Sequence, residues 1–122
     1  MTPGLNERHT STAYHAGRFL AICQHIQDLS NIELNSTYVD RFFGAACTRP
    51  LSILPRVFKT AVHRLRKIDD WKLRRDVEAS LIQLHQEFGE IWPKQLNSEG
   101  QGLFQLGFFH QAAALPRKDW RD

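Results

Sequence analysis

The chain has 122 residues, which suffices for one domain with a single hydrophobic core but not for two independent ones. Hydrophobic residues make up 42% and charged residues 24%, the proportions of an ordinary globular protein, and the formal net charge is +3 at pH 7. No apolar run approaches the roughly 20 residues of a membrane helix, and the N-terminus lacks the apolar segment of a signal peptide. We therefore predict a cytoplasmic protein without membrane contact.

The hydrophobic periodicity predicts an all-α fold, a single compact bundle of about five helices. Residues 1–9 are expected to be a flexible lead-in, residues 10–116 the bundle and residues 117–122 a charged tail. The first helix is predicted from residue 10 or 11 to about 29, with an apolar face of Ala16, Phe19, Leu20, Ile22, Cys23, Ile26 and Leu29. The second, capped by Asn35 or Ser36, is expected to end near residue 47.

The third predicted helix divides most clearly into two faces. Thr48 is expected to cap it and Pro50 to occupy its first turn, whereas Pro55 predicts a kink or a later start. Its apolar side consists of Leu51, Leu54, Phe58, Ala61, Val62, Leu65 and Ile68. Its opposite side carries Arg56, Lys59, His63, Arg66 and Lys67.

The last two helices are delimited by their capping signals. Asp69 or Asp70 is predicted to begin the fourth and Gly89 to end it, with an apolar side of Leu73, Val77, Leu81, Leu84 and Phe88. Residues 98–101 match a capping box that opens the fifth helix, which is expected to end before Pro116. Its predicted stripe is Leu103, Leu106, Gly107 and His110, beside Phe104, Phe108 and Phe109.

Charge is divided unevenly along the chain. Residues 41–75 contain ten basic and two acidic residues, a net +8, whereas the remainder contains six basic and eleven acidic ones, a net −5. Because Lys and Arg are the groups that bind phosphates, this block predicts a polyanionic partner, and nucleic acid is the first candidate. The candidate phosphate-binding residues are Arg41, Arg49, Arg56, Lys59, Arg64, Arg66, Lys67, Lys72, Arg74 and Arg75.

A simpler interpretation of these cations stays open: each is solvated, or pairs with a nearby acid, as Arg64, Arg66 or Arg74 would with Asp69, Asp70, Asp76 or Glu78. Two local acids cannot balance ten cations, however, so the group as a whole favours an anionic partner. The sequence has no helix-turn-helix, zinc-finger or aromatic RNP signature, which favours contact with phosphates over base reading. Among the interleaved aromatic residues we expect core packing for most, Phe42, Phe43, Phe58 and Trp92, and exposure for Trp71.

No pattern in the sequence indicates an enzyme, a metal site or a cofactor. The six histidines lack a paired i,i+4 arrangement with a third ligand, and Cys23 and Cys47 lack the C-x-x-C spacing. Both cysteines lie among apolar and small residues, which predicts buried thiols. The acidic residues are scattered, and no phosphate-binding glycine loop is present.

Three segments resemble one known family. Residues 35–50 read N-S-T-Y-V-D-R-F-F-G-A-A-C-T-R-P and resemble N-A-T-I-x-D-R-Y-F-G-S-A-S-A-T-P, a signature near the C-terminal end of the large subunit of type I-C CRISPR Cascade. Residues 13–21, A-Y-H-A-G-R-F-L-A, followed by Ile26-Gln27, and residues 101–111, Q-G-L-F-Q-L-G-F-F-H-Q, are similar to two flanking motifs of that family. Order and spacing agree, and the resemblance covers roughly residues 13–115.

In that family the C-terminal helical part of the large subunit can also be made separately by internal initiation, as the Cascade small subunit. The resemblance thus implies a non-catalytic helical bundle, starting at Met1, that packs beside the large subunit, the repeated backbone subunits and other copies of itself. It implies contact with target DNA, particularly the displaced non-target strand near the guide RNA–DNA hybrid, and a role in stabilising the R-loop during antiviral defence. Roles stay open for the motif residues Arg18, Asp40, Arg41, Gly44 and Pro50.

Two alternative functions belong to other classes of protein. The chain could be a purely structural scaffold whose cations pair with acidic patches of neighbouring subunits, or a stand-alone helical DNA-binding regulator that prefers one duplex sequence.

The residues most expected to contact phosphates are Arg56, Lys59, Arg66 and Lys67.

Overall fold

Five α-helices build the part of the chain that the computed structural model describes, residues 4–30 and 38–115. They are α1 (Thr12–Leu29), α2 (Tyr38–Thr48), α3 (Pro50–Leu65), α4 (Trp71–Phe88) and α5 (Ser98–Ala114). These two ranges contain no β-strand, so the predicted all-α fold is confirmed. Within them, no helix is long and apolar enough to cross a bilayer.

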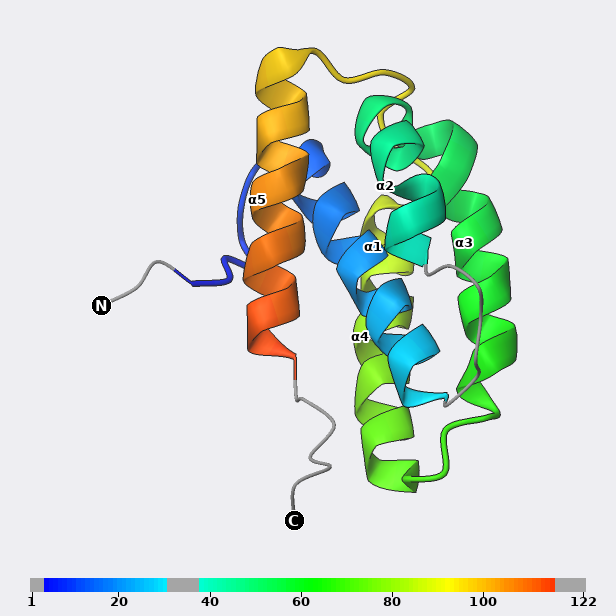
Figure 1. The fold of residues 1–122 in the computed structure, drawn as a ribbon. Coiled ribbons are helices and arrows are strands. Elements are labelled where there is room, and N and C mark those ends of the chain that lie inside the picture. Colours follow the sequence, from blue (N-terminus) through cyan, green and yellow to red (C-terminus); the bar gives the residue numbers. More distant parts are fainter. Residues whose placement is uncertain (1–3, 31–37, 116–122) are drawn as a thin grey trace.

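Helix α1 is the centre of the bundle because it is apolar nearly all round. Every residue from Ala13 to Cys23 is buried, and α1 contacts each of the other four helices. Figure 1 shows it running between α5 on one side and α3 on the other. A helix buried on all sides needs apolar or small residues at nearly every position, and the sequence from Ala13 onward supplies them.

Polar side chains cap three helices. Ser11 Oγ accepts a hydrogen bond from Tyr14 N at the start of α1, and Asp70 Oδ1 accepts from Lys72 N and Leu73 N, at 3.0 and 3.2 Å, at the start of α4. The cap of α5 is Asn97, whose Oδ1 accepts from Gly100 N at 2.8 Å. The capping box predicted at residues 98–101 is therefore wrong by one residue, because the amide oxygen of Asn97 takes the place expected for the Ser98 hydroxyl.

The junction of α2 and α3 also differs from the prediction. Thr48 is the last residue of α2 and donates its hydroxyl to the Gly44 carbonyl, while Arg49 occupies the cap position of α3 without a side-chain bond. The Leu51 amide at the start of α3 instead donates to the Pro93 carbonyl at 3.0 Å. Helix α3 begins at Pro50 and continues through Pro55, so the later start considered for it is wrong. The caps predicted at residues 35 and 36 lie outside the described residues.

The buried faces of α3 and α5 are rotated slightly from the predicted stripes. On α3, Val57 is buried, whereas Val62 is 39% exposed. On α5 the buried residues are Phe104, Gly107, Phe108 and Gln111, while Leu106 and Phe109 of the predicted set are exposed. Helix α5 has apolar residues on several sides, so periodicity alone did not select the side that faces α1.

Candidate nucleic-acid interface

Five basic residues follow one another along α3 and just past its end. Arg56, Lys59 and His63 are exposed on α3, and at 100° per residue they fall within an arc of about 60°. Arg66 and Lys67 are also exposed and follow Leu65, the last residue of the helix. The opposite side of the same helix is buried through Leu54, Val57, Ala61 and Leu65. The predicted division into a core side and a cationic side is therefore confirmed within α3, whereas Arg66 and Lys67, predicted on the same helix, lie past its end. We call the five residues the α3 stripe.

The cations of this region are not neutralised within the protein. From Arg49 to Arg75, no basic side chain of the described chain forms an ion pair, whereas Arg18 lies 3.9 Å from Glu7 elsewhere. The pairing of Arg64, Arg66 or Arg74 with nearby acids, which the sequence left open, is not present in the described ranges. An uncompensated row of charges repels itself and attracts anions.

Six of the ten predicted phosphate-binding residues lie outside the α3 stripe, and three of these come before α4 in the chain. Arg41 is exposed on α2, with its guanidinium 5.1 Å from the centre of the Phe42 ring. Arg49 is exposed at the α2–α3 junction. Arg64 is half-buried on the flank of α3, and its buried Nε has no hydrogen-bond partner in the described residues. The structure thus does not bring all ten predicted residues onto one face.

The remaining predicted cations lie at the start of α4. Lys72, Arg74 and Arg75 are exposed there, next to Trp71, which is 55% exposed. Arg75 places its guanidinium 5.0 Å from the centre of the Trp71 ring. The expectation that Trp71 stays outside the core is confirmed, and Trp92, by contrast, is buried beside Phe19.

Two glycines of the recognised motifs set the contact between α1 and α5. A Cβ atom on Gly17 would overlap the Phe104 carbonyl oxygen and lie 2.8 Å from Phe108 N. A Cβ atom on Gly107 would overlap the Tyr14 carbonyl oxygen. The two helix backbones therefore touch directly, and only glycine permits this approach.

Beside the glycines lies a buried polar network, which the sequence did not predict. Arg18 donates from Nε to Gln111 Oε1 and from Nη1 to His15 Nδ1, both at 2.8 Å. His15 Nε2–H donates to the His9 carbonyl at 2.6 Å, so the ring is neutral, with its proton on Nε2. Burial lowers the pKa of His15, and the Arg18 charge lowers it further.

A second polar pair, Tyr14 and His110, extends this network toward the N-terminus. The Tyr14 hydroxyl lies 2.8 Å from His110 Nδ1 and accepts from the Asn6 amide at 3.0 Å. The side chains of Tyr14, His15 and Arg18 are thus hydrogen-bonded inside the bundle. Arg18, whose role the sequence left open, is a structural residue of the α1–α5 contact. The sequence contains a signal for this buried network, because the polar residues His15 and Arg18 lie three positions apart in a segment that is otherwise largely apolar.

Burial of His15 makes the stability of the protein sensitive to acid. Because the pKa of His15 is lowered from 6.5 on folding, the unfolded chain binds more protons below about pH 6.5, and the free energy of unfolding falls there. Burial lowers the pKa of His25 as well. We expect a loss of up to about 1.4 kcal/mol per pH unit for each histidine, measured by urea unfolding between pH 7.5 and 5.5.

Substitution of His25→Gln should reduce this dependence, and the exposed His63→Gln serves as the control. Equal stability of the wild-type protein at the two pH values would contradict the prediction.

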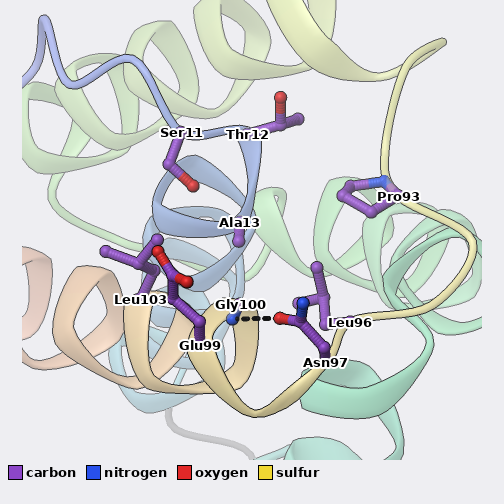
Figure 2. A pocket seen from close by; sticks show the side chains of 9 residues that line it. All are labelled: Ser11, Thr12, Ala13, Pro93, Leu96, Asn97, Glu99, Gly100 and Leu103. Carbon is purple, nitrogen blue, oxygen red and sulfur yellow. Dashed lines mark hydrogen bonds between the residues drawn. The ribbon is translucent and has the colours of Figure 1, made fainter.

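One surface pocket lies where the starts of α1 and α5 meet the loop around Pro93. Figure 2 shows its lining, in which Glu99 is the one ionisable side chain among the described residues. The polar atoms of Ser11 and Asn97 are occupied as helix caps, the second by the hydrogen bond to Gly100 drawn in Figure 2. A single carboxylate supplies neither a paired acid and base nor an activated nucleophile.

Cys23 and Cys47 are buried free thiols, as predicted, and burial raises the pKa of both. In the described ranges, no three His, Cys, Asp or Glu side chains lie close enough together to hold a metal ion.

The comparisons with known proteins agree with the motifs. No curated protein matches the sequence. The family model described as CRISPR-associated protein (Cas_Csd1) matches residues 1–115, nearly the whole chain. The matched range includes the α1–α5 contact, the α3 stripe and the start of α4. Because the match covers nearly the whole chain, the chain belongs to the Cas_Csd1 family of CRISPR-associated proteins, a Cascade-related family.

Proposed function

We propose that this chain is a non-catalytic small subunit of a type I-C Cascade complex, which binds the DNA backbone and stabilises the R-loop by holding the displaced non-target strand. The observation that carries the proposal is the α3 stripe: exposed, unpaired within the described residues and opposite the buried side of its helix. Family membership supports a place in a CRISPR surveillance complex.

The dimensions of the α3 stripe suit a short length of strand. From Arg56 to Leu65, the end of α3, the chain advances nine residues, or about 14 Å at helical rise, and Arg66 and Lys67 follow directly. Successive nucleotides of a stacked strand are about 3.4 Å apart, so the helical part of the stripe would follow roughly four of them. Lys and Arg side chains bind phosphates without regard to sequence, which suits a complex whose guide RNA reads the target.

The outer side of α5 favours a second candidate function, a protein scaffold. From Gly100 to Leu115 the sequence has no charged residue, and Leu106 and Phe109 are 44% and 61% exposed. An uncharged surface with a large exposed aromatic ring suits an apolar protein neighbour rather than a polyanion. Figure 1 shows α5 and α3 on opposite sides of α1, so one molecule could contact a protein through α5 and DNA through α3.

Omission of the subunit separates the two candidate functions. Complexes reconstituted with and without this chain should both assemble, by native mass analysis, but only the complete complex should retain target DNA in a gel shift. Loss of assembly in its absence would favour the scaffold. Unchanged DNA retention without the chain would overturn the proposed function.

A further inference from the structure

We propose that Trp71 is a stacking platform for an unpaired base of a single-stranded nucleic acid whose phosphates are held by the neighbouring cations. The inference rests on the proposed function and deepens it, because it names the strandedness of the ligand and the residue that recognises it. The site consists of Trp71 with Arg66, Lys67, Lys72 and Arg75, which we call the α4 corner.

The ring of Trp71 is presented by a rigid element. It is the first residue of α4, and the next two backbone amides, those of Lys72 and Leu73, donate to Asp70 Oδ1 at 3.0 and 3.2 Å. One turn later, Arg75 places its guanidinium over the ring at 5.0 Å. With Arg75 over one face, Trp71 still has 55% of its surface exposed. A base could therefore stack on the ring with little ordering of the protein.

The surroundings of the ring are charged rather than apolar, and the cations Arg66, Lys67, Lys72, Arg74 and Arg75 outnumber the acids Asp69, Asp70 and Asp76. Lys72 and Arg75 are exposed on the same helical turn, and Arg66 and Lys67 are exposed in the connection just before it. Lys67 is four residues from Trp71, so their Cα atoms are at most about 14 Å apart. An apolar protein partner would meet unpaired charges here, whereas a polynucleotide would neutralise them and cover the ring at once.

Stacking on an indole selects for unpaired bases. In a duplex each base face is covered by its neighbours, whereas a single strand can turn one base onto an aromatic side chain. The α4 corner thus adds a preference for single strands to the α3 stripe, which can attract phosphates of any polynucleotide.

The test is binding of the full chain to three fluorescent probes at low salt: a 15-nucleotide oligothymidylate, an oligouridylate of equal length and a 15-base-pair duplex. Trp71→Ala should weaken binding to single strands about 5- to 150-fold, Trp71→Phe should keep most of the affinity, and duplex binding should not change. Loss on either single strand supports the inference, and the two arms show whether DNA or RNA is preferred. Ile91→Ala, at a hydrophobic residue that is 59% exposed outside the α4 corner, is the matched control and should have no effect.

Two outcomes overturn the inference: no binding of either single strand by the wild-type chain, or a Trp71→Ala variant whose single-strand affinity is unchanged or falls only as much as its duplex affinity. Charge reversal at Arg56 and Lys59 distinguishes this failure from failure of the proposed function. If charge reversal weakens binding while Trp71→Ala does not, the phosphate-binding surface is supported and the stacking platform is wrong. If the assembled complex keeps its DNA in both variants, both proposals fail.

Discussion

Substitution of Gly17→Ala or Gly107→Ala is expected to lower the free energy of unfolding by about 1–3 kcal/mol or more. In each case the new methyl group meets a backbone carbonyl of the other helix, that of Phe104 or Tyr14, and not the end of a mobile side chain. The two helices must separate to admit it, which would also stretch the bonds of Arg18 to Gln111 and His15. Urea unfolding at pH 7.5 measures the loss.

Gly102→Ala is the matched control, because Gly102 lies on the same helix α5 but a Cβ atom there would have no neighbour within 4 Å. Its replacement should stabilise the protein by about 0.5–1 kcal/mol, since alanine favours helix. If Gly17→Ala and Gly107→Ala were as stable as Gly102→Ala, the direct backbone contact between α1 and α5 would be wrong.

Charge reversal on the α3 stripe is expected to weaken DNA retention by the assembled complex without affecting its assembly. The variant Arg56→Glu/Lys59→Glu removes two phosphate contacts, and Lys67→Glu removes a third. Each lost contact should make the slope of log affinity against log salt shallower by about 0.7 for single-stranded DNA, or about 2 for the triple variant. Four contacts in the wild-type stripe correspond to a slope near −3. Gel shifts at several salt concentrations measure this slope.

The control for the double variant is Arg8→Glu/Lys94→Glu, which makes the same change of charge at exposed residues outside the α3 stripe. It should leave the slope of the complex nearly unchanged, although long-range repulsion lowers affinity slightly at low salt. An equal loss in both double variants would assign the effect to net charge. An unchanged slope in the stripe variant would show that DNA lies elsewhere.

Much of the fold could be predicted because local signals coincide with the boundaries. Asp70 as cap and Gly89 at the end delimit α4 as expected, and Pro50 begins α3 as a first-turn proline should. The division of α3 into a core side and a cationic side followed from periodicity alone, because Arg56 and Lys59 cannot share a face with Leu54 and Ala61. These features depend on residues within one or two turns of each other.

Other features depended on contacts between helices. The predicted apolar stripe of α5 is shifted by one position from the residues that are buried in the structure. Leu103, Phe104, Leu106 and Phe108 are all apolar, so only packing against α1 selects Phe104 and Phe108 as the buried residues. Local spacing marks the polar residues of α1, but it does not reveal that Arg18 bonds to Gln111, which lies 93 positions away in the chain.

The sequence by itself determined the helical class, most helix boundaries, the buried thiols and the cationic side of α3, because composition, capping and periodicity act within a helix. The tertiary structure alone decided that the backbones of α1 and α5 touch at Gly17 and Gly107. It also decided that Arg18 forms hydrogen bonds with His15 and Gln111, and that Arg64 is half-buried on the flank of α3 and not part of the α3 stripe. The reason is physical: these outcomes depend on which surfaces meet when apolar faces are buried, and a linear pattern records the faces but not their partners.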